Sequence, residues 1–159
     1  MISRLSGTIV HQDLRYVVLD VAGVGYKVYT PMPETHAMNS KAIFWIYMAV
    51  RDDAMDLYGF VTRDHLELFE LVISVSGIGP KTALNILAVA SPETLVTAIS
   101  SQDSSHLTKV SGIGKKKAER ISETLAQQND VRGIMQFLLE HNISPRLATK
   151  IRERYQSRA

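Results

Sequence analysis

The first sixty residues alternate between short runs of β-branched and aromatic side chains and short breaks that contain Gly, Pro, Asn or Asp. Runs of this length and composition predict β-strands, and their close spacing favours antiparallel neighbours. Five such strands are enough for a small barrel, with turns such as Gly23-Val24-Gly25 between them. The predicted strands are residues 8–10, 16–21, 26–30, 42–48 and 56–60.

From His65 onward the apolar residues recur at helical spacing, as in Leu66, Phe69 and Val72. Thr62 or Asp64 is the expected N-cap of the first helix, because a short polar side chain satisfies a free amide at the helix start. The rest of the chain reads as short helices separated by Gly-, Pro- and Ser-containing breaks. The predicted fold class is therefore multi-domain, with a β part followed by an α part.

The composition excludes several classes of protein. The chain has no cysteine, which excludes a disulfide framework, a thiolate zinc site and a cysteine nucleophile. Its start has no secretory signal, and no apolar run is long enough to span a bilayer, so we expect a cytoplasmic protein without a membrane partner.

The charge is nearly balanced, with 18 basic against 16 acidic side chains, and this excludes a general polycation. Any nucleic-acid site must therefore be local. The positive excess lies in residues 131–159, which carry six basic and two acidic side chains.

The helical half contains an internal repeat. Residues 75–86 align with residues 110–121 at an offset of 35, and 8 of the 12 positions are identical. The shared core is Gly-Ile-Gly, with a lysine two residues after the second glycine and an alanine four residues after it. Each copy lies between two apolar helical segments, so the repeat predicts two helical hairpins in tandem.

The repeat has the chemistry of a phosphate-binding turn. Two glycines let the backbone turn tightly and approach a ligand closely, and the free amides at the start of the next helix attract an anion. Lysines in the first helical turn add positive charge. The alternative is that the glycines only end one helix and begin the next. The candidate DNA-binding residues are Ser76, Gly77, Ile78, Gly79, Lys81, Thr82, Ser111, Gly112, Ile113, Gly114, Lys115, Lys116 and Lys117.

The spacing of the glycines excludes two other phosphate-binding motifs, the P-loop and the dinucleotide-binding fingerprint. Neither copy completes the Gly-x-x-x-x-Gly-Lys-Ser/Thr pattern of a P-loop. Gly23-Val24-Gly25 lies between two predicted strands and does not lead into a helix, so it is no dinucleotide fingerprint. The five histidines are scattered, and we assign no catalytic residue, metal or cofactor.

The order of these motifs resembles the RuvA family of Holliday-junction-binding subunits. The resemblance covers about residues 1–125 and implies an OB-fold barrel (1–62) and a tandem helix-hairpin-helix domain (63–128). Residues 129–159 are predicted from the residues themselves to be a short basic helical segment. It also implies four-way junction DNA as ligand, in recombination and repair, a RuvB-type AAA+ motor as partner, and a homotetramer, with an octamer on DNA left open. The motifs that carry it are Met1–Gly7, Gly23–Val28, Val50–Ala54, Leu57–Phe60, Gly77–Lys81 and Gly112–Lys116.

In that family an acidic pair before the last barrel strand forms a pin at the centre of the junction, and the matching residues here are Asp52 and Asp53. Carboxylates at that point repel phosphates and keep the strands apart. Two alternatives stay open: plain turn residues, or Mg²⁺ ligands of a nuclease together with Asp56.

The tail departs from the family pattern, because no long polar linker precedes residues 131–151. This segment is similar to the hairpin region of RecD-type helicases, which implies a third hairpin with Arg146 and Lys150 near phosphates. The alternative is a helix pair with a solvated basic face. Whether the tail binds DNA, the motor or another partner stays open.

The sequence therefore predicts a non-enzymatic protein that holds a four-way junction open for a partner motor. Two alternatives remain: an accessory module of a helicase or nuclease that binds DNA without junction preference, and an interaction scaffold whose hairpins pack only against each other.

Overall fold

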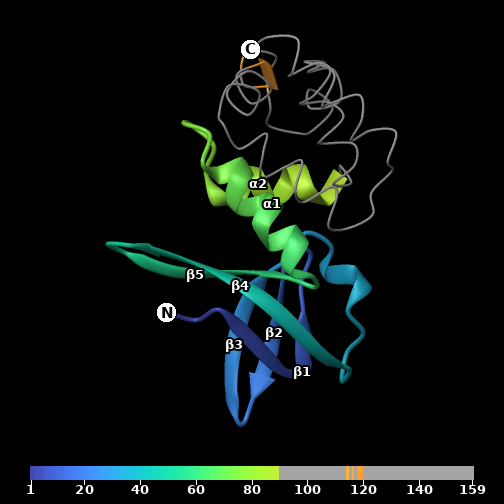
Figure 1. The fold of residues 1–159 in the computed structure, drawn as a ribbon. Coiled ribbons are helices and arrows are strands. Elements are labelled where there is room, and N and C mark those ends of the chain that lie inside the picture. Colours follow the sequence, from blue (N-terminus) through green and yellow to red (C-terminus); the bar gives the residue numbers. More distant parts are fainter. Residues whose placement is uncertain (90–113, 115, 117, 120–159) are drawn as a thin grey trace. The chain divides into compact units, whose positions relative to one another are not determined.

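The computed structural model describes residues 1–89 and, beyond them, residues 114, 116, 118 and 119. Its contacts divide the chain into two compact units, Met1–Ala88 and Val89–Ala159, each considered by itself. The first unit consists of a barrel and two helices (Figure 1). In chain order the elements are β1 (Arg4–Gln12), β2 (Tyr16–Val21), β3 (Val24–Tyr29), the short 3₁₀ helix η1 (Pro33–Thr35), β4 (Lys41–Arg51), β5 (Ala54–Phe60), α1 (Arg63–Ile73) and α2 (Pro80–Val89).

The five strands close into a barrel in the order β1-β2-β3-β5-β4. All neighbours are antiparallel except β3 and β5, which run parallel. A small five-stranded barrel of this kind is an OB-fold, so the predicted fold class of a barrel followed by helical hairpins is confirmed. Four strands are longer than predicted: β1 begins at Arg4, β3 begins at Val24, β4 ends at Arg51, and β5 begins at Ala54.

Strand β1 closes the barrel by pairing with β4 through its first half and with β2 through its second half. A bulge between Ile9 and His11 bends the strand between these two partners. Gly7 lies at the crossing, where a Cβ atom would be 2.0 Å from the carbonyl oxygen of Asp20. Glycine at position 7 thus lets two backbones come close together.

The turn between β2 and β3 differs in position from the predicted one. Ala22 and Gly23 both have positive φ, 53° and 87°, as a two-residue hairpin turn requires, while Val24 and Gly25 already belong to β3. The amide of Gly23 donates to a carboxylate oxygen of Asp20 over 3.2 Å. The turn therefore lies one residue earlier than the glycine pattern suggests.

The barrel interior is filled by one side chain in two from each strand, as the alternation of strand residues requires. Ile9, Val17, Leu19, Val28 and Phe44 are fully buried there. The complete cluster is Leu5, Ile9, Val17, Leu19, Val28, Phe44, Ile46 and Leu57.

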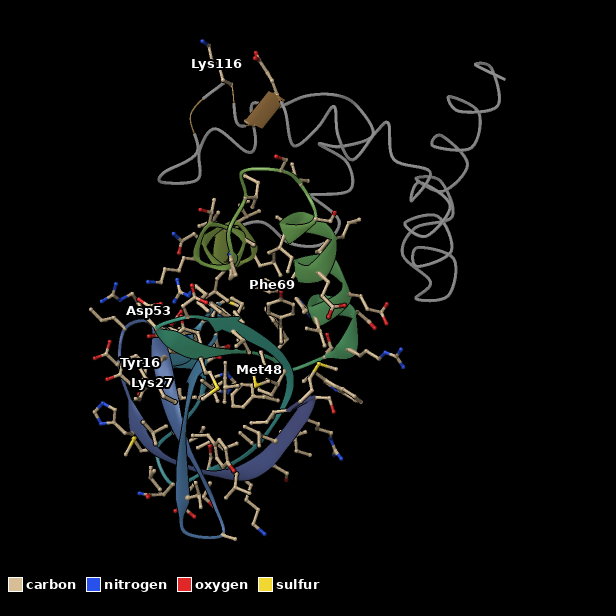
Figure 2. All side chains as sticks on the ribbon, turned by 90° about the vertical axis from the view of Figure 1, so that its left-hand side faces the viewer. Tyr16, Lys27, Met48, Asp53, Phe69 and Lys116 are labelled. Atoms are coloured by element: carbon tan, nitrogen blue, oxygen red, sulfur yellow. The ribbon has the colours of Figure 1, made fainter. Side chains whose placement is uncertain are left out.

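Helix α1 begins after Thr62, whose hydroxyl accepts a hydrogen bond from the amide of His65 over 3.3 Å, so one of the two predicted N-caps is correct. Phe69 of α1 points toward the barrel (Figure 2) and lies 4.8 Å from Phe60, between ring centroids. This contact packs α1 against the barrel within the first unit. In the part of the chain that the structure describes, no helix is both long and apolar enough to cross a membrane.

Four tyrosines form a row across neighbouring strands of the barrel. Tyr16 is the register partner of Tyr29, Tyr29 of Tyr58, and Tyr58 of Tyr47. Phe69 extends the row into α1, with its ring centroid 5.4 Å from that of Tyr47 and 5.5 Å from that of Tyr58. Cross-strand aromatic pairs of this kind stabilise a sheet beyond the area they bury.

Candidate nucleic-acid interface

The first Gly-Ile-Gly motif forms the turn between α1 and α2. Val75 and Ile78 are buried, and the amide of Ile78 donates to the carbonyl of Val75 over 3.0 Å. Gly77 has a φ of +86°, a left-handed conformation that glycine adopts without strain. The buried side chains of Val75 and Ile78 anchor the turn in the core, while Ser76, Gly77 and Gly79 are exposed.

Helix α2 starts directly after Gly79, the second glycine of this motif. The carbonyl of Gly79 accepts the first intrahelical hydrogen bond, from the amide of Ala83 over 3.0 Å. The amides of Lys81 and Thr82 precede the amide of Ala83, the first intrahelical donor, so they have no acceptor within the helix and face out of its end, where the helix dipole favours an anion. The side chain of Lys81 is exposed beside them.

Nothing in the described part of the structure requires a glycine at position 79. Its φ is not positive, and a Cβ atom there would meet no described atom within 4 Å. A glycine that neither its conformation nor its neighbours require is typical of a place where a ligand approaches the backbone. Gly79 therefore fits a phosphate-binding turn.

The second motif is described at four positions only: Gly114, Lys116, Ala118 and Glu119. They repeat the geometry of the first motif, because the amide of Ala118 donates to the carbonyl of Gly114 over 3.1 Å. Ala118 is fully buried, as Ala83 is, and Lys116 is exposed at the position that matches Lys81 (Figure 2). The other candidates, Ser111, Gly112, Ile113, Lys115, Lys117, Arg146 and Lys150, lie outside the described residues.

The acidic pair Asp52-Asp53 is the two-residue turn of the β4–β5 hairpin. The ladder continues to the last possible pair, Arg51 opposite Ala54, and both aspartates are exposed. The hairpin reaches out beyond the other strands (Figure 1). The two carboxylates therefore lie at the tip of a paired, twisted ribbon that other elements leave uncovered.

Asp56, the third acid considered as a metal ligand, is paired with a cation. Its carboxylate forms an ion pair with the guanidinium of Arg51, with 2.5 Å between Nη2 and Oδ2. Within the described ranges, no cluster of three or more His, Cys, Asp and Glu side chains could hold a metal ion. The hairpin thus separates Asp56 from the pair at its tip, which makes the nuclease alternative weaker.

Sequence reasoning missed one arrangement of charges. Arg15, Lys27 and Lys81 come from three different elements and line one cleft of the first unit. Alternation in β3 places Lys27 and Tyr29 on the same outer face, but no sequence pattern brings that face to α2.

Two family models match the chain. Residues 1–59 match the RuvA N-terminal domain, and residues 69–127 match the SAM-like helix-hairpin-helix tandem. The two matches cover the barrel and both Gly-Ile-Gly motifs.

Curated relatives named Holliday junction branch migration complex subunit RuvA match along much of the chain. The Brevibacillus brevis protein is 44% identical over 123 residues, which are 76% of this chain and 60% of the relative. The Shewanella frigidimarina protein is 37% identical over 159 residues, covering 93% of this chain and 77% of the relative. The Lactococcus lactis protein is 42% identical over 135 residues, covering 84% and 68%.

This chain spans about three fifths of the length of the Brevibacillus brevis relative, yet more than two thirds of two others. The closed barrel, the repeated helix starts and the extent of these matches all point to the same family. The chain belongs to the RuvA family.

Proposed function

We propose that this chain binds four-way DNA junctions through the backbone phosphates of the arms, with no catalytic activity of its own. The contacts are made by the two Gly-Ile-Gly turns and the lysines that follow them. Such contacts position a protein on DNA without reading its sequence.

One observation carries this proposal: the same helix start occurs twice in a RuvA chain. In both motifs the carbonyl of the second glycine, Gly79 or Gly114, accepts the same hydrogen bond from an alanine amide four residues later. An exposed lysine lies two residues after each of these glycines. Two anion sites of the same build suit a repetitive ligand, and a DNA backbone presents its phosphates at regular spacing.

The acidic pin completes the proposal. Asp52 and Asp53 lie at the exposed tip of the β4–β5 hairpin, where phosphates of crossing strands would meet two negative charges. Attraction at the arms and repulsion at the crossover favour an open four-way junction over a linear duplex.

The partners follow from the names of the relatives. Each is called a subunit of a branch migration complex, so we infer that this chain also works within such a complex. We further propose, from the resemblance to the RuvA family, that it acts as a cytoplasmic homotetramer with a RuvB-type motor in recombination and repair. The alignment with the Shewanella frigidimarina protein leaves out only 7% of this chain, so it includes part of residues 129–159. This supports a tail of the RuvA kind, with DNA contact through Arg146 and Lys150 as the competing role.

The test is a gel-shift competition in which a labelled four-way junction is challenged with unlabelled junction or with linear duplex of the same sequences, at several salt concentrations. We expect the junction to compete at least about tenfold better, and log affinity to fall linearly with log salt.

Equal competition by the linear duplex would overturn junction specificity and would favour the general accessory module. Absence of salt-sensitive DNA binding would leave only the interaction scaffold.

A further inference from the structure

A cleft of about 330 Å³ lies between the outer face of β2 and β3 and the helix α2. All of its lining residues belong to the first compact unit. Three cationic side chains line it: Arg15 from the β1–β2 connection, Lys27 from β3 and Lys81 from α2. We call it the basic cleft.

Lys27 is held in place by aromatic rings. Lys27 lies beside Tyr16 (Figure 2). Its ammonium nitrogen is 4.4 Å from the ring centroid of Tyr16 and 5.3 Å from that of Tyr29. Attraction between a cation and a ring face restricts the otherwise flexible lysine. A hydrogen bond to Tyr29 raises the pKa of Lys27 above its usual range, which further favours the charged form.

The basic cleft carries no carboxylate of its own to neutralise these cations, since none of its lining residues is acidic. Asp56 is the acid whose charge acts on Lys27. Its carboxylate is already paired with Arg51. The lining therefore presents a net positive charge, together with the amide side chain of Asn85.

The tyrosines of the cleft are already engaged by their neighbours, which favours a phosphate over a nucleic-acid base as the ligand. The Lys27 ammonium lies over the ring of Tyr16, and the ring of Tyr29 stacks on that of Tyr58 at 5.6 Å. The lining residues that remain are cations and hydrogen-bond donors such as Arg15, Lys81 and Asn85, the groups that bind phosphate oxygens.

We propose that the basic cleft is an additional phosphate-binding site, which takes a backbone phosphate of the DNA strand held at the first Gly-Ile-Gly turn. Lys81 joins the two places, because it follows the turn in sequence and also lines the cleft. The site would extend the grip on one DNA arm from the helix end onto the barrel. This inference rests on the proposed function.

The test measures junction affinity and its salt dependence for the full chain, with Arg15→Gln and Lys27→Gln combined. The cleft takes one phosphate, so losing this contact in the double variant should make the slope of log affinity against log salt shallower by about 0.9. At about 0.1 M salt we expect roughly tenfold weaker binding, equal for arms of different sequence. Lys41→Gln is the control, because Lys41 is an exposed lysine of the barrel that does not line the cleft.

The outcomes separate this site from the proposed function. If the wild-type chain binds junctions and the double variant keeps its affinity and slope, the basic cleft is no phosphate site although the function stands. If the wild-type chain shows no salt-sensitive junction binding, both proposals fall. If the double variant does not fold, Arg15→Gln alone, at an exposed position, must make the slope shallower by up to about 0.9, and an unchanged slope overturns the site.

Discussion

The amide of Ala83 donates a 3.0 Å hydrogen bond to the carbonyl of Gly79, and Ala118 forms the same bond with Gly114 over 3.1 Å. Both alanines are fully buried, whereas both glycines are exposed. Each pair thus anchors a helix start from its buried side and leaves the glycine backbone open to a ligand.

Replacing Gly79 or Gly114 by valine should weaken DNA binding more than it weakens the fold. A side chain there meets no described atom within 4 Å, so we expect a loss of unfolding free energy of only about 1 kcal/mol, from the poorer N-cap. Junction affinity should fall at least about tenfold, because a branched side chain keeps phosphate away from the amides. Gel shifts with several sequences and thermal unfolding measure both effects, and a loss that varied with base sequence would contradict a backbone contact.

Gly77→Ala and Gly79→Ala form a matched pair that should differ in how much each lowers the free energy of unfolding. Gly77 has a φ of +86°, so an alanine there is strained and should lower the unfolding free energy by about 1 kcal/mol or more. Gly79 lacks this strain, and its alanine variant should change stability by less. Denaturant unfolding compares the two, and equal stabilities would show that the left-handed conformation at Gly77 is not needed.

Asp52→Asn combined with Asp53→Asn should leave junction affinity unchanged or raise it by up to about tenfold, because repulsion of phosphates at the hairpin tip is removed. Strand separation at the crossover should decrease, which a fluorescent base analogue placed there reports. Asp13→Asn with Glu34→Gln removes the same charge from exposed barrel positions and is the control. A marked loss of affinity in the first variant would argue against a repulsive pin.

Acidification should destabilise the barrel partly through His36. Its ring packs edge-to-face on Phe44 at 4.9 Å, and burial lowers the pKa of His36 below its ordinary 6.5. The unfolded chain then binds a proton more readily than the folded one as pH falls through about 6.5, so stability is lost below that value. The drop in unfolding midpoint between about pH 7.5 and 5.5 should be smaller in His36→Gln than in wild type, and an equal drop would contradict this role.

The sequence predicted the number and order of the strands well, because their central residues alternate between buried and exposed positions. It missed the strand ends, such as Arg4 and Arg51, because backbone pairing continues there through polar, exposed residues. Near Gly23 it placed the turn one residue late, since Ala22 also adopts a positive φ that alanine rarely shows.

The candidate site was predictable where it repeats. Two copies of Gly-Ile-Gly with lysine at the same offset indicate a backbone-binding turn without any tertiary information. The basic cleft could not be predicted in this way, because Arg15, Lys27 and Lys81 meet only through the packing of α2 near β2 and β3. The pairing of Asp56 with Arg51 likewise depends on the register of the hairpin.

The row of tyrosines has a consequence for how the first unit unfolds. Tyr47 and Tyr58 belong to the barrel, yet both pack on Phe69 of α1, so helix and barrel share one aromatic layer. Melting α1 would expose those barrel rings to water, so the lost burial of apolar surface would destabilise the barrel as well as the helix. The barrel and α1 should therefore melt as a single cooperative body, with tyrosine fluorescence and helical circular dichroism changing at one temperature.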